Sequence, residues 1–119
     1  MIKNLSILIL GFTIGIFVSP ELIPQYPFVD IELINLSEKN IKEIRIINPE
    51  RKTIYLLENI LIGQKSKVDY FPGGETTYEL KVTFTDGTIL NREPYYVESG
   101  YKMTETIYKD KIKTDFNLY

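Results

Sequence analysis

The sequence predicts an all-β protein: a small antiparallel β-sandwich, immunoglobulin-like in its broad architecture, of about seven to nine strands after one N-terminal hydrophobic helix. Apolar residues recur with a period of two in short runs from Phe28 onward. Asn, Pro, Gly and Asp separate these runs at intervals of about ten residues, and no later segment has helical periodicity. The Cys and Trp markers of immunoglobulin domains are both missing, so the strand order stays open, and an up-and-down barrel is the competing closure.

The N-terminal helix is predicted from the apolar run LSILILGFTIGIFV, which spans Leu5 to Val18 and follows Lys3. A helix over residues 1–19 that stops at Pro20 is just long enough to cross a bilayer. Without an A-x-A-like cleavage site, we expect a retained signal anchor. Lys3 then stays on the cytoplasmic side, so the protein is a single-pass cell-membrane protein whose C-terminal domain lies outside the cytoplasm, in the periplasm. Secretion after signal cleavage is the alternative, and a buried core helix is a weaker one.

A short spacer is predicted between this helix and the domain. Residues 20–27 contain Pro20, Pro24 and Pro27, which favour an extended and fairly stiff chain. The sequence after the spacer, residues 28–119, is long enough for one domain with a modest core, and we predict a single β-sandwich there.

The clearest predicted strand covers residues 77–85. Its even-numbered positions are apolar and its odd-numbered positions are Glu, Lys or Thr, so one face is expected in the core and the other in solvent. The core-facing residues would be Tyr78, Leu80, Val82 and Phe84.

Asp86-Gly87 follows this strand and is a strong hairpin signal, because a two-residue type I′ turn needs positive φ at both positions. The chain should then return antiparallel over residues 88–91. In this register Phe84 faces Ile89 on the core side, and Leu90 points outward unless a bulge intervenes.

The remaining predicted strands follow from the same alternation. The last of them is expected to be a sheet edge, and a turn at residues 109–111 should connect it to the strand before it. Their ranges are 29–36, 41–47, 53–57, 68–71, 95–98, 101–108 and 112–118.

Composition argues against several functional classes. The 14 Lys and Arg residues are interspersed with 16 Asp and Glu residues, so no basic stripe is available and we expect no nucleic-acid partner. The absence of Cys removes disulfides, thiolate metal sites and Cys nucleophiles. The absence of His removes the commonest general base and transition-metal ligand. We therefore predict no enzyme, no catalytic or metal-binding residue, and no cofactor.

The string Ser99-Gly100-Tyr101-Lys102 matches the S-x-x-K pattern, in which a lysine accepts the proton of a serine hydroxyl. That chemistry needs the two residues one helical turn apart, whereas residues three apart on a strand face opposite sides. We interpret the string as a glycine bend between two strands, and a Ser-Lys hydrolase remains the least favoured function.

Turn chemistry also explains two other strings. The glycine-rich segment 71–75 lacks the Lys and the following helix of a phosphate-binding loop, so we predict a hairpin loop. Asp86-Gly87 lacks the second Asp of an aspartic protease and the ligand spacing of a calcium loop.

Tyrosine is the one unusual feature of the C-terminal third. The chain has nine Tyr residues, and Tyr offers a large apolar area with a polar tip that suits protein interfaces. Tyr is also a favoured strand residue, so part of this enrichment reflects the fold. Of the consecutive pair Tyr95 and Tyr96, one should be core and the other exposed. An acidic rim is expected from Glu93, Glu98 and Glu105. The predicted protein-binding residues are Tyr95, Tyr96, Tyr101, Tyr108 and Glu98.

These observations favour a non-enzymatic, membrane-anchored, outward-facing module that binds another protein. One version is an immunity or inhibitor protein that caps a toxin. The alternative is a structural subunit of a bacterial envelope or secretion assembly that adds its last strand to a neighbour's sheet. Over residues 28–107 the pattern resembles small signal-anchored β-sandwich proteins of bacteria, a resemblance of architecture that transfers no functional residue.

Overall fold

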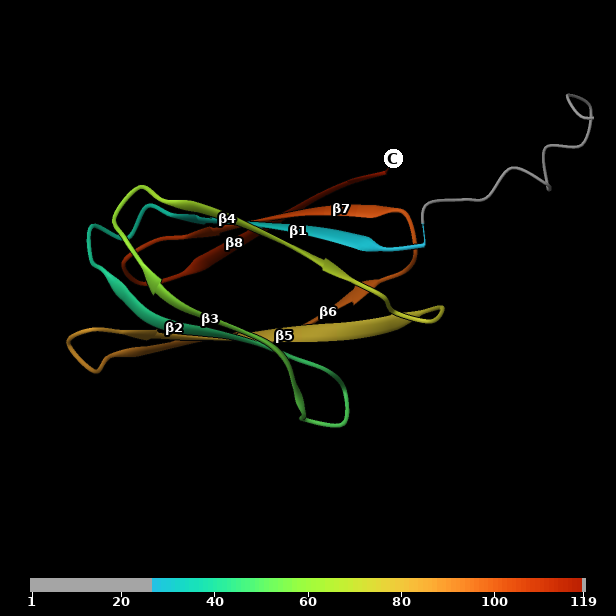
Figure 1. Cartoon of the computed structure of the whole chain (residues 1–119), viewed down its shortest axis with the longest axis horizontal. Coiled ribbons are helices and arrows are strands. Elements are labelled where there is room, and N and C mark those ends of the chain that lie inside the picture. Colours follow the sequence, from blue (N-terminus) through green and yellow to red (C-terminus); the bar gives the residue numbers. More distant parts are fainter. Residues whose placement is uncertain (1–26, 119) are drawn as a thin grey trace, which may run out of the picture.

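The computed structural model describes residues 27–118, which form two packed β-sheets (Figure 1). This part of the chain contains no helix, and so none that could cross a membrane. The predicted anchor helix of residues 1–19 and nearly all of the predicted spacer lie outside the described residues. The eight strands are β1 Val29–Asn35, β2 Ile41–Ile47, β3 Thr53–Ile60, β4 Lys65–Tyr70, β5 Thr76–Phe84, β6 Ile89–Val97, β7 Tyr101–Ile107 and β8 Ile112–Leu118.

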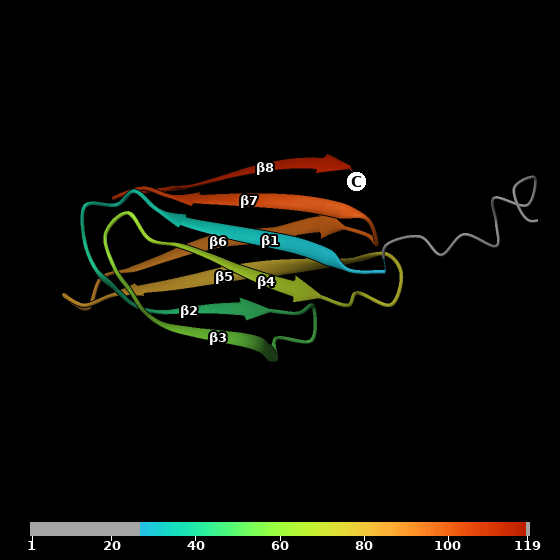
Figure 2. The ribbon, with the colours of Figure 1, turned by 45° about the horizontal axis from the view of Figure 1, so that its top comes forward.

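The first sheet has the strand order β4-β1-β7-β8 and the second has the order β3-β2-β5-β6. The predicted all-β sandwich is therefore confirmed. The hairpins β2–β3, β5–β6 and β7–β8 each stay within one sheet, whereas the other connections cross from one sheet to the other. Strands β8 and β6 form the edges on one side of the sandwich, and β3 and β4 form the edges on the other (Figure 2).

One strand pair corrects the prediction of a wholly antiparallel sandwich. Strands β1 and β7 run parallel, with Asp30 opposite Lys102 and Asn35 opposite Ile107. Successive strands alternate in direction along the sandwich (Figure 2). Two odd-numbered strands that become neighbours must therefore be parallel.

The core lies between the sheets and follows the alternation seen in the sequence. In β5 the four predicted residues Tyr78, Leu80, Val82 and Phe84 are all buried. The other buried hydrophobic residues are Val29, Ile31, Leu33, Ile41, Ile44, Ile46, Ile60, Val97, Met103 and Ile107.

The β5–β6 hairpin differs from its predicted register. The Gly87 N–H donates to the Phe84 carbonyl (3.0 Å) and the Phe84 N–H donates to the Thr88 carbonyl (2.9 Å), so the loop has three residues. Gly87 takes the left-handed conformation (φ 89°) that such a bulged turn requires. The extra residue inverts the faces of the returning strand. Ile89 is half exposed, and Leu90 packs against the core.

The two runs predicted at residues 88–91 and 95–98 form the single strand β6. Pro94 lies within it, where a central strand would lose a ladder hydrogen bond. Strand β6 tolerates this residue because it is an edge and because its register with β5 shifts between Tyr78 and Leu80, directly opposite Pro94. Strand β8 is also an edge, as predicted.

The sandwich has two distinct ends, and we call the end at which the chain enters β1 the proximal end and the opposite end the distal end. The proximal end carries Phe28, the loop 71–75 and the turn between β6 and β7, and the Gly100 N–H donates to the Phe28 carbonyl there (3.0 Å). The distal end carries the loops after β1, β3, β5 and β7. Figure 1 shows the C-terminal end of β8 on the proximal side.

Candidate protein-binding surface

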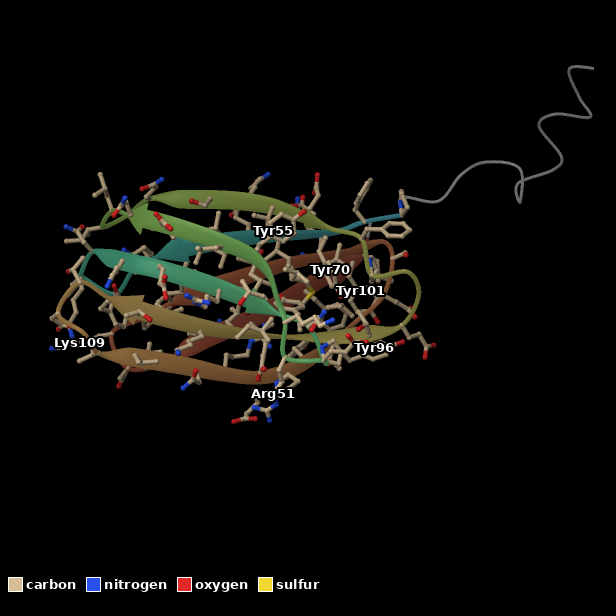
Figure 3. All side chains as sticks on the ribbon, turned by 60° about the horizontal axis from the view of Figure 1, so that its bottom comes forward. Arg51, Tyr55, Tyr70, Tyr96, Tyr101 and Lys109 are labelled. Atoms are coloured by element: carbon tan, nitrogen blue, oxygen red, sulfur yellow. The ribbon has the colours of Figure 1, made fainter. Side chains whose placement is uncertain are left out.

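Four aromatic side chains meet where β6, β7 and β8 approach one another near the proximal end. Tyr101 of β7 stacks on Phe116 of β8, with ring centroids 5.2 Å apart and an interplanar angle of 11°. Tyr96 packs edge-on against Tyr101 at 6.1 Å, and Tyr95 lies 6.5 Å from Phe116. Figure 3 shows Tyr96 and Tyr101 side by side. We call Tyr95, Tyr96, Tyr101 and Phe116 the aromatic cluster.

The cluster combines fixed rings with exposed apolar surface. Tyr95 and Tyr101 are half-buried and pack against the core. Tyr96 is 45% exposed and Phe116 is 48% exposed, and Leu118, at the end of the same strand, is 69% exposed. Rings held by a core and by one another lose little conformational freedom when a partner binds. The prediction that one of Tyr95 and Tyr96 faces the core and the other solvent is confirmed.

Glu98 lies beside the cluster. The Tyr96 hydroxyl donates to its carboxylate at 2.8 Å. This hydrogen bond is the main reason why the pKa of Tyr96 lies well above its ordinary value, and desolvation and the charge of Glu75 add to it. Glu93 is exposed on β6. Two of the three predicted acidic rim residues, Glu93 and Glu98, are thus at the surface.

The prediction for the third rim residue, Glu105, was wrong, because its side chain is fully buried. It lies on the same face of β7 as Met103 and Ile107, which are core residues. The period-two alternation could have identified Glu105 as inward-facing. Its charge suggested a surface position instead.

Tyr108 is separated from the other predicted tyrosines. It follows the distal end of β7, where the Lys111 ammonium lies 5.7 Å from its ring centroid. Seven residues of strand between Tyr101 and Tyr108 correspond to about 23 Å. The structure therefore brings together Tyr95, Tyr96, Tyr101 and Glu98, and leaves Tyr108 outside this surface.

A buried polar network supports the cluster from inside. The Glu105 carboxylate accepts hydrogen bonds from the Tyr78 hydroxyl (2.7 Å), the Thr114 hydroxyl and the Arg92 guanidinium. Arg92 also donates to the Tyr78 carbonyl at 2.9 Å. Tyr78 and Arg92 belong to the second sheet, whereas Glu105 and Thr114 belong to the first. The network therefore fastens the two sheets together, and the sequence alone did not reveal it.

Arg92 also links this network to the aromatic cluster. Its guanidinium lies 4.7 Å from the ring centroid of Tyr78 and 5.5 Å from that of Tyr95. Burial raises the pKa of Tyr78 far above its ordinary value, and the charge of Glu105 raises it further. Tyr78 is therefore a neutral hydrogen-bond donor at any ordinary pH. These contacts describe a structural network that positions Tyr95.

The Ser99 and Lys102 pair is not assembled for nucleophilic chemistry. The Ser99 hydroxyl donates to the Pro27 carbonyl at 3.2 Å, and Lys102 is exposed on β7. Within residues 27–118 no hydrogen bond joins the two side chains. Gly100 lies between them with φ 91°, as expected for a glycine bend.

Asp86 is a turn residue, as predicted. Its carboxylate accepts hydrogen bonds from the Thr88 N–H (3.0 Å) and hydroxyl (2.6 Å), and from the Lys39 ammonium (2.9 Å). The Thr88 hydroxyl is the leading cause that lowers the pKa of Asp86 well below its ordinary range, followed by Lys39. The other motif, the glycine-rich loop 71–75, leads into strand β5 and not into a helix.

The described part of the chain contains no group of three or more His, Cys, Asp or Glu side chains that could hold a metal ion. The aromatic cluster with Glu98 is the candidate site that the geometry supports best, because it combines packed rings with exposed apolar surface. No protein-family model matches the chain, and no curated protein matches it in sequence.

Proposed function

We propose that this protein is a non-enzymatic module that binds another protein through the aromatic cluster and its acidic rim. The observation that carries the proposal is the continuous row Tyr96–Tyr101–Phe116, which is contributed by β6 of the second sheet and by β7 and β8 of the first and exposes large apolar groups next to Glu98. Aromatic residues in well-packed positions dominate the binding energy of many interfaces.

The polar tips of this surface add directionality. Tyr96 and Glu98 already form a hydrogen bond, so a partner can reach either the phenol or the carboxylate in a defined orientation. With Glu93 and Glu98 at the edge, the surface favours a partner with a cationic rim. Arg92 holds Tyr95 from behind, which limits rearrangement on binding.

The membrane anchor is part of the same proposal. Residues 1–19 would tether the domain to the cell membrane, and the domain would face the periplasm. Fully extended, residues 20–27 reach at most about 28 Å, so the proximal end and the aromatic cluster would stay near the bilayer.

The immunoglobulin-like description is also part of the proposal, in the sense of two packed sheets around one core. The strand arrangement differs from that of an immunoglobulin domain: β1 and β2 lie in different sheets, whereas the first two strands of an immunoglobulin domain lie in the same sheet.

Two kinds of partner fit this surface. An immunity or inhibitor protein would cover the active site of a toxin with it. A structural subunit of an envelope or secretion assembly would use it to contact other membrane subunits, and the position of the cluster near the anchored end favours this second candidate.

The test is site-specific photo-cross-linking of the full-length, tagged protein in native membranes. A benzoylphenylalanine at position 96 or 118 probes the proposed surface. The same probe at Leu56 on β3 is the matched control, because Leu56 is also 45% exposed but lies on another edge of the sandwich. We expect a defined adduct from positions 96 and 118 that Leu56 does not give.

The partner's identity separates the two versions. A single stoichiometric enzyme-like partner supports the inhibitor, and several envelope subunits support the assembly. The adduct should weaken at least about tenfold when Tyr101→Ala removes the supporting ring. Adducts that are equal at positions 96, 118 and 56 would refute the proposed surface.

A further inference from the structure

The edge strand β8 differs from the other three edges of the sandwich. Strand β6 contains Pro94 and a register shift, and β3 contains Asn59 with φ 55°. Strand β4 carries Lys65 and Lys67, a charge pattern that discourages strand addition. Strand β8 has neither Pro nor a bulge, and all seven of its residues pair in register with β7.

The hydrogen-bonding pattern between β7 and β8 shows which backbone groups of β8 face outward. The Tyr108 N–H donates to the Lys111 carbonyl at 2.8 Å, so these residues form a hydrogen-bonded pair. Hydrogen-bonded pairs alternate along an antiparallel ladder, so Lys113 and Asp115 also bond to β7. The N–H and C=O groups of the even-numbered residues 112, 114, 116 and 118 then point away from the sheet.

We propose that β8 pairs with β8 of a second copy of this chain, antiparallel about a two-fold axis at Thr114. Lys113 of each copy then lies opposite Asp115 of the other, and Ile112 lies opposite Phe116. The two first sheets join into one continuous sheet across the axis. The residues that form hydrogen-bonded pairs across the axis are the even-numbered ones, whose backbone groups are free to do so.

Charge selects this register over its neighbours. A two-fold axis at Asp115 would place Asp115 opposite its own copy, and an axis at Lys113 would place Lys113 opposite its own copy. Like charges directly opposite one another on adjacent strands are destabilising, whereas opposite charges stabilise the pair. An axis at Thr114 is the one among these three that gives two Lys–Asp contacts.

The side chains involved are available for this pairing. Lys113 and Asp115 are 61% and 57% exposed, and their contact within the strand is long, at 3.9 Å. Phe116 is 48% exposed, and its apolar area would be covered by Ile112 of the second copy. A large exposed apolar residue on a regular, unprotected edge is the usual feature of strand addition.

This inference rests on the backbone and the charges of β8 and stands without the proposed function, although both use the exposed side chain of Phe116. Tyr96 and Glu98 lie on the β6 side of the sandwich and take no part in the β8 pairing. Because Ile112 of the second copy would cover the exposed side chain of Phe116, each half of the dimer would present the Tyr95, Tyr96 and Tyr101 part of the aromatic cluster to a partner.

The first test is charge reversal, with the full-length protein in detergent and its mass followed by sedimentation over a range of concentrations. Asp115→Lys and Lys113→Asp alone should each weaken dimerisation about tenfold, because each creates two like-charge contacts. The double variant Lys113→Asp/Asp115→Lys restores opposite charges and should return the dissociation constant to within about threefold of the original. Lys65→Asp on the edge of β4 is the control and should change nothing.

The second test determines the register through cysteines, which the natural chain lacks. Residues 113 and 115 of the two copies would form a non-hydrogen-bonded pair about 4.5 Å apart, within the range of a disulfide. Tagged Lys113→Cys mixed with untagged Asp115→Cys should therefore form a disulfide heterodimer on oxidation, and Asp115→Cys alone should not.

The outcomes are decisive in each direction. Efficient cross-linking of Asp115→Cys alone would place the axis at Asp115 and overturn the proposed register. A monomer at all concentrations, or a dimer indifferent to every charge reversal, would overturn β8 pairing. Circular dichroism of each variant shows that it is folded, and the position-96 photo-adduct reports the proposed function separately, because Asp115→Lys should leave it intact.

Discussion

Arg92 and Glu105 form an ion pair inside the sandwich that joins its two sheets. Arg92 is 10% exposed and Glu105 is fully buried. Glu105 also accepts hydrogen bonds from Tyr78 and Thr114, so its carboxylate is well satisfied. The Nε of Arg92 is buried without a hydrogen-bond partner in the described structure, which adds to the cost of burying the guanidinium.

Removal of Arg92 should destabilise the protein strongly. Arg92→Ala leaves the Glu105 carboxylate buried without its counter-charge, which costs about 3–5 kcal/mol in comparable cases and lowers Tm by well over about 10 °C in a domain of this size. Thermal unfolding by circular dichroism measures the loss. The control is Lys52→Ala, because the exposed Lys52–Glu50 pair (3.6 Å) contributes little. Equal Tm values for the two variants would contradict the prediction.

The pair can also be removed as a unit. Arg92→Met with Glu105→Gln eliminates both charges and keeps an acceptor for Tyr78 and Thr114. Replacing a buried ion pair by well-packed hydrophobic residues of similar volume is often neutral or stabilising, and this variant likewise leaves no uncompensated buried charge. We expect the double variant to recover at least about half of the stability that Arg92→Ala loses.

Asn35 should be irreplaceable even by its closest analogue. Its buried side-chain amide lies 2.8 Å from the Lys39 carbonyl and 3.1 Å from the Leu61 carbonyl, and its oxygen accepts from Ser37. It therefore fixes two distal loops to each other. Asn35→Asp places an acceptor against these carbonyls and should cost at least about 3 kcal/mol. Denaturant unfolding measures this change, with Asn117→Asp on exposed β8 as the control, which should shift stability by under about 0.5 kcal/mol.

Asp86 should remain ionised at unusually low pH. A lowered pKa means that the carboxylate's stabilising contacts are fully present above the unfolded-state pKa, about 3.9, and are lost only as pH falls through the lower folded value. NMR titration of the Asp86 carboxyl measures this pKa. Thr88→Val removes the leading hydrogen bond and should raise the pKa towards 3.9 by more than Lys39→Met does. No change in Thr88→Val would contradict the assignment.

Tyr96 should ionise later than an ordinary tyrosine. Its raised pKa means that the contact with Glu98 stabilises the fold below about pH 10 and is lost as pH rises through the folded value. The difference in tyrosinate absorbance between the natural chain and Tyr96→Phe isolates this phenol. In a Glu98→Gln background the same difference titration should move towards the ordinary value. A titration of Tyr96 that Glu98→Gln leaves unchanged would show that the hydrogen bond is not the cause.

Gly87 should resist substitution for conformational reasons alone. A Cβ at this position would meet no heavy atom within 4 Å, but φ is 89°, which other L-residues disfavour. Gly87→Ala should therefore cost about 1 kcal/mol, and Gly87→Asn should cost less, because Asn tolerates the left-handed region better. Equal losses in the two variants would contradict a backbone origin. Urea unfolding of both variants compares them.

Most strands were predictable because each has one face in the core and one in solvent. The alternation in β5 identified all four of its core residues, and the same rule located β1, β2, β7 and β8 within a residue or two. Prediction was weakest at an edge strand, where only one side of the backbone is hydrogen-bonded and a Pro residue is therefore tolerated. Pro94 divided β6 in the prediction because the sequence does not say which strands are edges.

The candidate site was predictable only in part. Alternation placed Tyr95 and Tyr96 on opposite faces, but Phe116 was not among the predicted binding residues and Tyr108 proved to lie elsewhere. Tyr96, Tyr101 and Phe116 lie on three consecutive strands, but β6 belongs to the other sheet, so the two sheets had to pack together before these rings could meet.

The sequence by itself determined the all-β class, the core faces and the turn at Asp86, because these depend on the period-two pattern and on local backbone preferences. Only the tertiary structure decided the parallel β1–β7 pair, the bulged register of β6 and the burial of Glu105. The parallel pair and the burial of Glu105 depend on which strands become neighbours, and the register of β6 depends on the three-residue loop that closes its hairpin with β5. A charged residue such as Glu105 can occupy the core only when another sheet supplies Arg92 to compensate its charge, and no local pattern encodes that partner.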